Sequence, residues 1–411
     1  MSNALLDFYR CPPHLLPKSL PSLWHLLPAC PRQPASETSQ IIDYLRRERY
    51  ALNGYEGNRH FLSTPALMRA YYHLRPLLGV SVRKYLQRLF LGDWRKLAFP
   101  RWPVDTSVEN LLEQSLLLSM RASNVERMPF IWFWPNGAMS SVIITHDVET
   151  SAGLRGISGL QDIDDAFNIR ASYQLVPEER YYIPEGLRAK ILSRGCEVNI
   201  QDLNHDGRLF SSQEMFFRRA PAINDHLKRY GAQGFRSGSL YRNVEWYGAL
   251  SAAYDMSVPN VAHLEPQRGG CCTVFPYFIG KLLELPLTTI QDYSLFHILG
   301  EYSTDLWKEQ ISLITQKHGL ASFIIHPDYL KEARAVEVYR NLLAHLAVLR
   351  RDGRAWIALP GDVNRWWRER SRMKLVSQDG QWKIAGSGHE RAQVAYARVV
   401  GGQLTYCLDE R

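Results

Sequence analysis

The pattern of apolar residues along the chain changes character near residue 130. Before that point, apolar positions recur every three or four residues, as they do on the buried face of an amphipathic helix. This spacing predicts helices over Ser39–Leu52, Thr64–Leu78 and Ser107–Arg121, and Val82–Leu91 is both amphipathic and basic. Residues 1–40 contain many prolines and therefore predict an extended arm.

After residue 130, short apolar runs alternate with segments that have a helical pattern. The runs that predict strands are Ser141–Thr145, Ala171–Val176, Glu197–Ile200, Gly234–Phe235, Leu283–Leu287, Ala321–Ile325 and Trp356–Leu359. Helices are expected between them, over residues 163–167, 185–194, 214–230, 244–252, 304–317 and 333–351. Such alternation favours βαβ units and a parallel, barrel-like sheet, so the fold class is α/β.

The last forty residues have a third pattern, in which short alternating runs are separated by glycines. They predict a small antiparallel β appendage. Four parts follow: an extended arm (1–40), a basic helical region (41–130), a (β/α) barrel (131–372) and a β tail (373–411). The adjacent Trp366 and Trp367 fit either a sugar- or lipid-facing patch or the docking of a C-terminal helix on the barrel.

Composition places the chain among folded globular proteins. It has 411 residues, of which 45% are hydrophobic and 22% charged, which is ordinary for such proteins. No apolar run approaches the roughly 20 residues that span a bilayer. The first residues lack the pattern of a signal peptide, and the six cysteines form no Cys-x-x-Cys pair. We therefore expect a cytoplasmic protein with reduced thiols and no zinc knuckle.

The positive charge is concentrated in the first third of the chain. The formal net charge is +8, and residues 1–130 contribute +7 of it, with 17 Lys and Arg against 10 Asp and Glu. A basic region of this kind either faces an anionic partner, such as a membrane surface, or forms a solvated helix surface. No nucleic-acid-binding module is recognisable, so we expect no nucleic-acid partner.

Polar side chains that can bind a metal or move a proton follow four of the predicted strands. They are His146, Asp147 and Glu149; Gln201, Asp202, His205 and Asp206; Arg236; and His326 and Asp328. The carboxyl ends of parallel barrel strands lie on one face, so these residues are expected to converge there. The chain has no Gly-x-Ser-x-Gly motif, which disfavours a serine hydrolase.

The order of these segments resembles the polysaccharide deacetylase family, the NodB-homology carbohydrate esterases. The segments are T-H-D-V-E (Thr145–Glu149), Q-x-x-x-H-D-G (Gln201–Gly207), G-F-R-S (Gly234–Ser237) and I-H-P (Ile325–Pro327). The resemblance covers about half of the chain, over Ser141–Leu359. It implies a distorted (β/α) barrel and a role in carbohydrate metabolism, namely hydrolysis of the carbon–nitrogen bond of an N-acetyl group on an amino sugar.

The resemblance also implies roles for individual residues. Asp147 matches the general base, Arg236 the arginine that orients it, and His326 the general acid. Amide hydrolysis needs an activated water and a proton for the leaving amine. A divalent metal lowers the pKa of bound water toward about 7 and polarises the carbonyl, and Glu149 and His205 match positions that bind such a metal.

The third metal position is Gln201, where the family has histidine, and Glu149 stands where the family usually has aspartate. An amide oxygen is a poorer zinc ligand than imidazole. The set Glu149, Gln201 and His205 therefore favours harder ions or binds any ion more weakly. Three outcomes follow: a deacetylase with an altered metal site, an enzyme acting on a different bond, or a site that has lost catalysis.

Three further residues are candidates for substrate binding: His146, Asp206 and Glu284. Alternatively, His146 is a strand-end histidine with backbone partners and Glu284 a loop-side carboxylate. The expected substrate is an acetylated sugar, a sugar nucleotide or a lipid-linked glycan. Two rival functions remain open: a non-catalytic glycan-binding protein on the same barrel, and a membrane-surface scaffold that uses Val82–Leu91 and the tryptophan pair.

Overall fold

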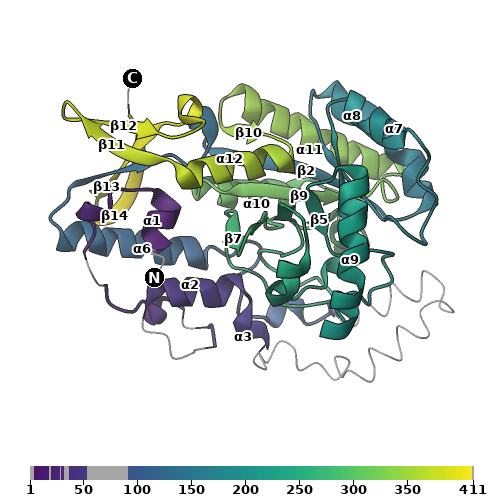
Figure 1. Ribbon diagram of the computed structural model, residues 1–411, viewed down its shortest axis with the longest axis horizontal. Helices are drawn as coiled ribbons and strands as arrows, with labels where there is room; N and C mark the ends of the chain where they lie inside the picture. The colour runs from purple at the N-terminus through teal and green to yellow at the C-terminus, as the bar shows by residue number, and fades with distance from the viewer. Residues whose placement is uncertain (1–3, 18–19, 28, 32–36, 53–90, 410–411) are drawn as a thin grey trace.

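The structure is a computed structural model that describes residues 4–17, 20–27, 29–31, 37–52 and 91–409. The helix expected over Thr64–Leu78 lies outside these residues, as does the basic stretch Val82–Leu91 apart from Leu91 itself. The described elements form a central curled sheet, helices around it, and a smaller sheet at one end (Figure 1).

The central sheet has nine strands in the described part of the chain, in the order β10-β2-β3-β4-β5-β6-β8-β7, and β9 also pairs with β2. Every pairing is parallel except that of β7 with β8. The strands are β2 (Ser140–Val148), β3 (Ser172–Leu175), β4 (Glu197–Gln201), β5 (Gly234–Arg236), β6 (Tyr254–Asp255), β7 (Tyr277–Ile279), β8 (Leu282–Glu284), β9 (Leu320–Ile325) and β10 (Ala355–Ile357). This sheet and its helices form the distorted (β/α) barrel that the sequence predicts.

The helices around the sheet bury the outer faces of its strands. They are α7 (Ser151–Ala166), α8 (Leu187–Ser193), α9 (Gln213–Tyr230), α10 (Asp305–Gln316), α11 (Ala333–Arg351) and α12 (Pro360–Arg372). All nine residues of β2 and all six of β9 are buried, as expected for strands covered on both faces. None of the described helices is long and apolar enough to cross a membrane.

Two helical elements begin or end differently from the sequence expectation. Helix α7 begins twelve residues before the expected start, because the Thr150 hydroxyl caps it by accepting hydrogen bonds from two backbone N–H groups. The helix expected over Ser39–Leu52 is divided into α2 (Thr38–Arg46) and α3 (Arg49–Leu52). Glu48 causes the break, since it has a positive φ of 54° and its buried carboxylate binds Arg242.

The extended arm expected over residues 1–40 contains a helix, α1 (Ala4–Tyr9). Leu5, Phe8 and Tyr9 of this helix are buried, and Phe8 contacts the ring of Phe133. The apolar residues of the first turns therefore dock on the rest of the protein instead of remaining in solvent.

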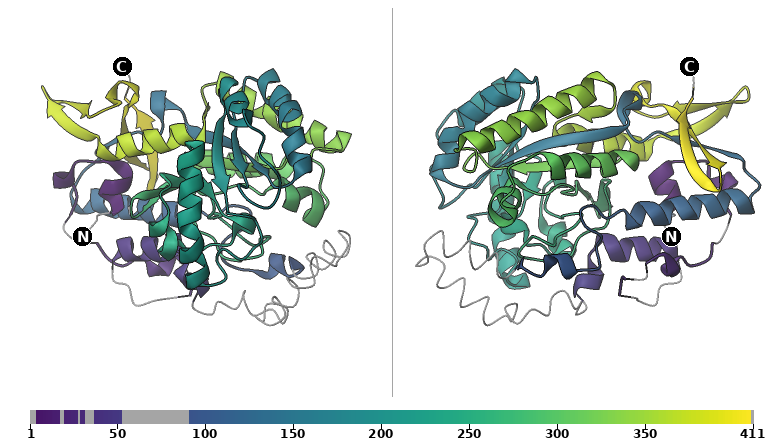
Figure 2. Two further views of the ribbon diagram at one scale, coloured as in Figure 1. Left: turned by 45° about the vertical axis from the view of Figure 1, so that its right-hand side comes forward. Right: turned by 180° about the vertical axis from the view of Figure 1, so that it is seen from behind.

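The β tail shares a sheet with residues that precede the barrel. Strand β1 (Arg127–Ile131) pairs with β13 (Val394–Val400), which pairs with β14 (Gln403–Leu408), and both pairings are antiparallel. A second hairpin joins β11 (Lys374–Gln378) and β12 (Gln381–Ala385). Figure 2 shows the C-terminal strands beside α6 (Ser107–Ala122), the helix expected over residues 107–121. The boundaries at 40, 130 and 372 remain proposals, and β1 spans the one at 130.

The tryptophan pair of α12 faces inward. Trp366 is fully buried and its indole N–H donates to the carbonyl oxygen of Phe133 at 2.8 Å. Trp367 is 6% exposed and lies against the rings of Trp134 and Phe275. The two tryptophans therefore dock α12 on the barrel and do not form a sugar- or lipid-facing patch.

Helix α6 is joined to the loop before β7 by a buried carboxylate. Glu109 accepts hydrogen bonds from the Thr273 hydroxyl and from the backbone N–H of Val274, at 3.2 Å. The second oxygen of this carboxylate has no hydrogen-bond partner among the described residues. Burial raises the pKa of Glu109 to about 7, against the hydrogen bond from Thr273 and the charge of Arg46, which lower it.

Stability is therefore expected to fall as the pH rises toward neutrality. The folded protein holds the Glu109 proton up to about pH 7, whereas the unfolded chain releases it near 4.5, so deprotonation favours unfolding between these values. Ionisation of Glu109 should lower the free energy of unfolding by about 2 kcal/mol between pH 5.5 and pH 8. Burial also raises the pKa of Glu265 to about 7, so urea unfolding should show a loss in wild type that exceeds the loss in Glu109→Gln by about 2 kcal/mol. An equal loss in both would contradict the prediction.

Candidate active site

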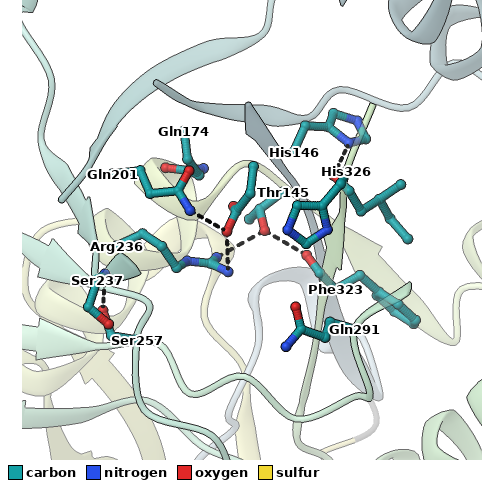
Figure 3. Close-up of polar contacts among 12 residues, drawn as sticks. Thr145, His146, Gln174, Gln201, Arg236, Ser237, Ser257, Gln291, Phe323 and His326 are labelled. Atoms are coloured by element: carbon teal, nitrogen blue, oxygen red, sulfur yellow. Dashed lines mark hydrogen bonds and ion pairs between the residues drawn. The ribbon is translucent and has the colours of Figure 1, made fainter. Parts of the chain in front are cut away.

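Four parallel strands, β2, β4, β5 and β9, bring polar residues to one face of the barrel. Gln201 ends β4 and is paired in register with Arg236, which ends β5. His326 follows β9, whose last residue pairs with β2 beside Asp147. Figure 3 shows Gln201, Arg236 and His326 pointing into the same space. The expected convergence of the strand ends is therefore present for these residues.

Asp147 lies at the centre of this group and is almost completely buried. One carboxylate oxygen, Oδ2, accepts a hydrogen bond from Gln201 Nε2 at 3.1 Å and lies 3.7 Å from Arg236 Nη1. The other, Oδ1, has no hydrogen-bond partner among the described residues. Burial raises the pKa of Asp147 above its usual value, although the charges of Arg236 and His326 lower it. This carboxylate is both oriented and able to accept a proton.

The guanidinium of Arg236 is held in place by a hydrogen bond to Thr145. Its Nη2 donates to the hydroxyl oxygen of Thr145 at 2.9 Å, and this hydroxyl donates to the carbonyl oxygen of Phe323 at 2.6 Å. Arg236 is fully buried, and its Nε and Nη1 make no hydrogen bond within the described residues. Its charge is therefore available to stabilise the Asp147 carboxylate.

Glu149 contacts three other members of the group. Its Oε1 lies 2.8 Å from His205 Nε2, 3.1 Å from Gln201 Nε2 and 3.6 Å from His326 Nε2. Burial alone would raise the pKa of Glu149, but His205 and His326 hold it well below its usual value. Glu149 is therefore ionised at neutral pH.

Gln201 presents its amide nitrogen, not its oxygen, to the two carboxylates. Nε2 donates to both Asp147 and Glu149, while Oε1 is buried with no partner in the described part of the chain. Two negative carboxylates attract a donor and repel an amide oxygen, which explains this orientation in the absence of a cation. The sequence analysis considered Gln201 only as an oxygen ligand and missed the donor role.

His326 is held by a carboxylate that the sequence analysis did not identify. Its Nδ1 is 2.6 Å from Asp292 Oδ1, and its backbone N–H donates to Asp292 Oδ2 at 2.7 Å. Burial would lower the pKa of His326, but the Asp292 charge raises it well above its usual value. The hydrogen bond at Nδ1 directs Nε2 toward Glu149. Asp292 follows no predicted strand, so no sequence signal marked it.

Asp147, Glu149 and His326 could together hold a metal ion. One ligand atom from each lies within 4.8 Å of the others. This set of two carboxylate oxygens and one imidazole nitrogen suits a divalent cation. The unpartnered Asp147 Oδ1 and Gln201 Oε1 also fit such an ion, because both are buried acceptors without donors. The set shares only Glu149 with the ligands expected from the sequence. His205 contacts Glu149, and Gln201 contacts Asp147 and Glu149 through its amide nitrogen.

The three predicted substrate-binding residues lie apart from this cluster. His146 is buried against α7, with Nε2 2.9 Å from Asp164 Oδ2. Asp206 forms an ion pair with Arg219 at 2.7 Å.

Glu284 accepts a hydrogen bond from the backbone N–H of Val258 at 3.0 Å and shares a buried hydrogen bond with Asp255. Burial and the Asp255 charge raise the pKa of Glu284 well above its usual value. Neither Glu284 nor His146 nor Asp206 makes a described contact with Asp147, Glu149 or His326. Substrate binding by these three residues stays a prediction that the contacts do not support.

Comparison with known proteins gives likenesses at the level of the fold. No family model and no curated protein matches the chain. Among solved structures it is similar to the allantoinase Puue, at 12% identity and a TM-score of 0.46 over 57% of this chain and 92% of that one. It is also similar to a probable polysaccharide deacetylase from Pseudomonas aeruginosa PAO1, at 12% identity and a TM-score of 0.46. That likeness covers 57% of this chain and 93% of the other.

A provisionally named polysaccharide deacetylase from Mycobacterium smegmatis is 16% identical, with a TM-score of 0.45 over 58% of this chain and 93% of that one. The resemblance in the motifs is thus accompanied by likenesses to solved structures named for the same family. Because these concern the fold, the chemistry of this chain has to be inferred from its own side chains.

Proposed function

We propose that this protein hydrolyses the N-acetyl amide of an amino sugar or glycan precursor, with the help of a divalent cation. The observation that carries the proposal is the pairing of two oriented groups on one face of the barrel. The Asp147 carboxylate, held by Arg236 and Gln201, and the His326 imidazole, held by Asp292, both adjoin Glu149. Such a base and acid are what amide hydrolysis requires.

In the proposed reaction, Asp147 accepts a proton from water as the water oxygen adds to the amide carbonyl. His326 then gives the proton on Nε2 to the nitrogen as the carbon–nitrogen bond breaks, and the products are acetate and a free amine. The raised pKa of His326 supports the second role, because it keeps the imidazole protonated at neutral pH. Arg236 supports the first, because its charge lowers the pKa of Asp147 against the larger effect of burial, which raises it.

The cation would be held by Glu149 and Asp147 with His205, because His326 Nε2 cannot bind it while that nitrogen carries the proton to be donated. When bound, it would polarise the carbonyl and lower the pKa of water. Two carboxylates and a single imidazole favour a harder ion than three nitrogen or sulfur ligands do. Deacetylation itself is tested by measuring acetate release from N-acetylated sugars in free, nucleotide-linked and lipid-linked forms.

Metal content is expected to depend on Gln201. The Gln201→His variant replaces a donor with an imidazole and should bind zinc at least tenfold more tightly than wild type, since imidazole is the better zinc ligand. Mass spectrometry of the purified proteins, after dialysis against one equivalent of zinc, measures this. His205→Ala in the same background is the control and should lose the gain. Equal zinc retention in wild type and Gln201→His would contradict the prediction.

One observation favours a second candidate function, a glycan-binding protein without catalysis. The Gln201 amide nitrogen donates hydrogen bonds to both carboxylates. These hydrogen bonds supply part of the stabilisation of negative charge that a bound cation would otherwise give. This candidate predicts sugar binding without acetate release and binding that is unchanged in Asp147→Asn. A cytoplasmic location, an anionic membrane surface as partner, and a scaffold role through residues 82–91 remain proposals.

A further inference from the structure

A cavity of about 590 Å³ lies where the N-terminal helices meet the barrel. Its walls are formed by α1, α2, β7 and α12, which surround the same region in Figure 1. None of its lining residues belongs to the candidate active site. The volume is within the range of about 300–1,000 Å³ that is usual for small-molecule sites.

Arg370 of α12 lines this cavity and has an uncompensated charge. It is only 1% exposed, and its guanidinium donates to three backbone carbonyl oxygens, those of Trp132, Phe8 and Ile131, at 2.9, 2.8 and 2.6 Å. No described carboxylate lies within ion-pair distance of it. Burial and, to a smaller extent, the nearby charge of Arg10 together lower the pKa of Arg370 to about 9. A buried cation in this state is stabilised by an anion.

Two more arginines, Arg46 and Arg10, line the cavity, and neither has a described carboxylate closer than 4.0 Å. Arg46 lies 5.3 Å from the ring centroid of Tyr277, and its buried Nε has no hydrogen-bond partner among the described residues. Burial lowers the pKa of Arg46 as well, and the charge of Glu109 acts on Arg46 and raises its pKa against this effect. Arg10 donates to the carbonyl oxygen of Met373 at 3.1 Å and reaches Asp7 only at 4.0 Å. Three guanidinium groups therefore border one space.

The lining also holds three acidic residues, Asp7, Glu37 and Asp43, and none of them has an ion pair shorter than 4.0 Å with one of these three arginines. Asp43 pairs with Arg47 at 2.7 Å and with Arg49 at 3.2 Å, and both arginines also reach Glu245. These four side chains form a self-contained ion-pair network. The side chain of Asp7 is 60% exposed, so solvent screens its charge.

We propose that this cavity binds a phosphate ester of nucleotide size, with the phosphate held by Arg10, Arg46 and Arg370. The planar guanidinium fork matches phosphate oxygens in pairs. A phosphate dianion also relieves the repulsion between Arg10 and Arg370. Trp367 and Tyr277 line the same cavity and offer aromatic surface for the organic part of the ligand.

Isothermal titration calorimetry of the full chain with AMP, UMP and inorganic phosphate tests the proposal. Wild type should bind a nucleoside monophosphate more tightly than inorganic phosphate. Arg46→Gln and Arg10→Gln should each weaken that binding roughly ten- to a hundredfold, because each removes a charged hydrogen bond. Arg351→Gln is the matched control, since its side chain is 74% exposed and outside the cavity, and it should bind as wild type does.

Three results would overturn the proposal. The first is the absence of nucleotide binding to folded wild type, and the second is equal affinity for inorganic phosphate and both nucleotides. The third is unchanged affinity in Arg46→Gln or Arg10→Gln proteins whose circular dichroism shows that they are folded.

Discussion

Replacing Asp147 with asparagine is expected to lower kcat for release of acetate by roughly 10²–10⁴-fold, the contribution of a general base. Asparagine has the same shape and can still accept the hydrogen bond that Gln201 donates at 3.1 Å. It cannot take a proton from water, so binding of the sugar should persist while turnover is lost. Acetate release and circular dichroism of the purified variant measure the two properties separately.

The matched control for this variant is Asp362→Asn, which removes a carboxylate from the first turn of α12, outside the active site. It should keep wild-type turnover. If a folded Asp147→Asn protein released acetate at the wild-type rate, the assignment of the general base would be wrong. If neither wild type nor variant released acetate from any sugar but both bound one, the glycan-binding alternative would stand.

Replacing His326 with glutamine is expected to lower kcat for amide hydrolysis by a similar factor of roughly 10²–10⁴. The amine is a poor leaving group and needs the proton on Nε2, whereas the phenol of an activated acetyl ester leaves without one. The variant should therefore lose far less activity on an activated ester than on an N-acetyl sugar. Steady-state kcat on the two substrates measures this difference.

The comparison with Asp147→Asn makes this test specific. Loss of the general base should slow the hydrolysis of both substrates, because both reactions need an activated water. Loss of the general acid should slow mainly the amide. Equal losses on amide and ester in His326→Gln would show that His326 acts on water or on a bound cation, not on the leaving group.

Seven of the nine described strands and most helices of the barrel could be predicted from the sequence because their apolar patterns are local. The short strands β6 and β7 were not predicted. β2 and β9 are continuous apolar runs, and Gln201, Arg236 and His326 each end or follow a strand, so their convergence follows from parallel topology alone. The division of α2 from α3 could not be predicted. It depends on the long-range ion pair of Glu48 with Arg242.

The orientations within the site could not be predicted for a similar reason. Whether Gln201 presents nitrogen or oxygen depends on two carboxylates of another strand, which sequence spacing does not locate. Asp292 lies in a short helical segment that no sequence pattern predicted, so only the folded chain shows that it holds His326. The pairing of β1 with β13 could not be predicted either, because β13 lies more than 260 residues later in the chain.

The pairing of β1 with β13 has a consequence for how the protein is made. Strand β1 is synthesised before the barrel and β13 after it, so this sheet forms only when the C-terminal residues have left the ribosome. Until then β1 has an unpaired strand edge, and such edges promote association between chains. A nascent chain stopped before residue 394 would keep that edge open, which makes the last strands a safeguard against aggregation as well as part of the fold.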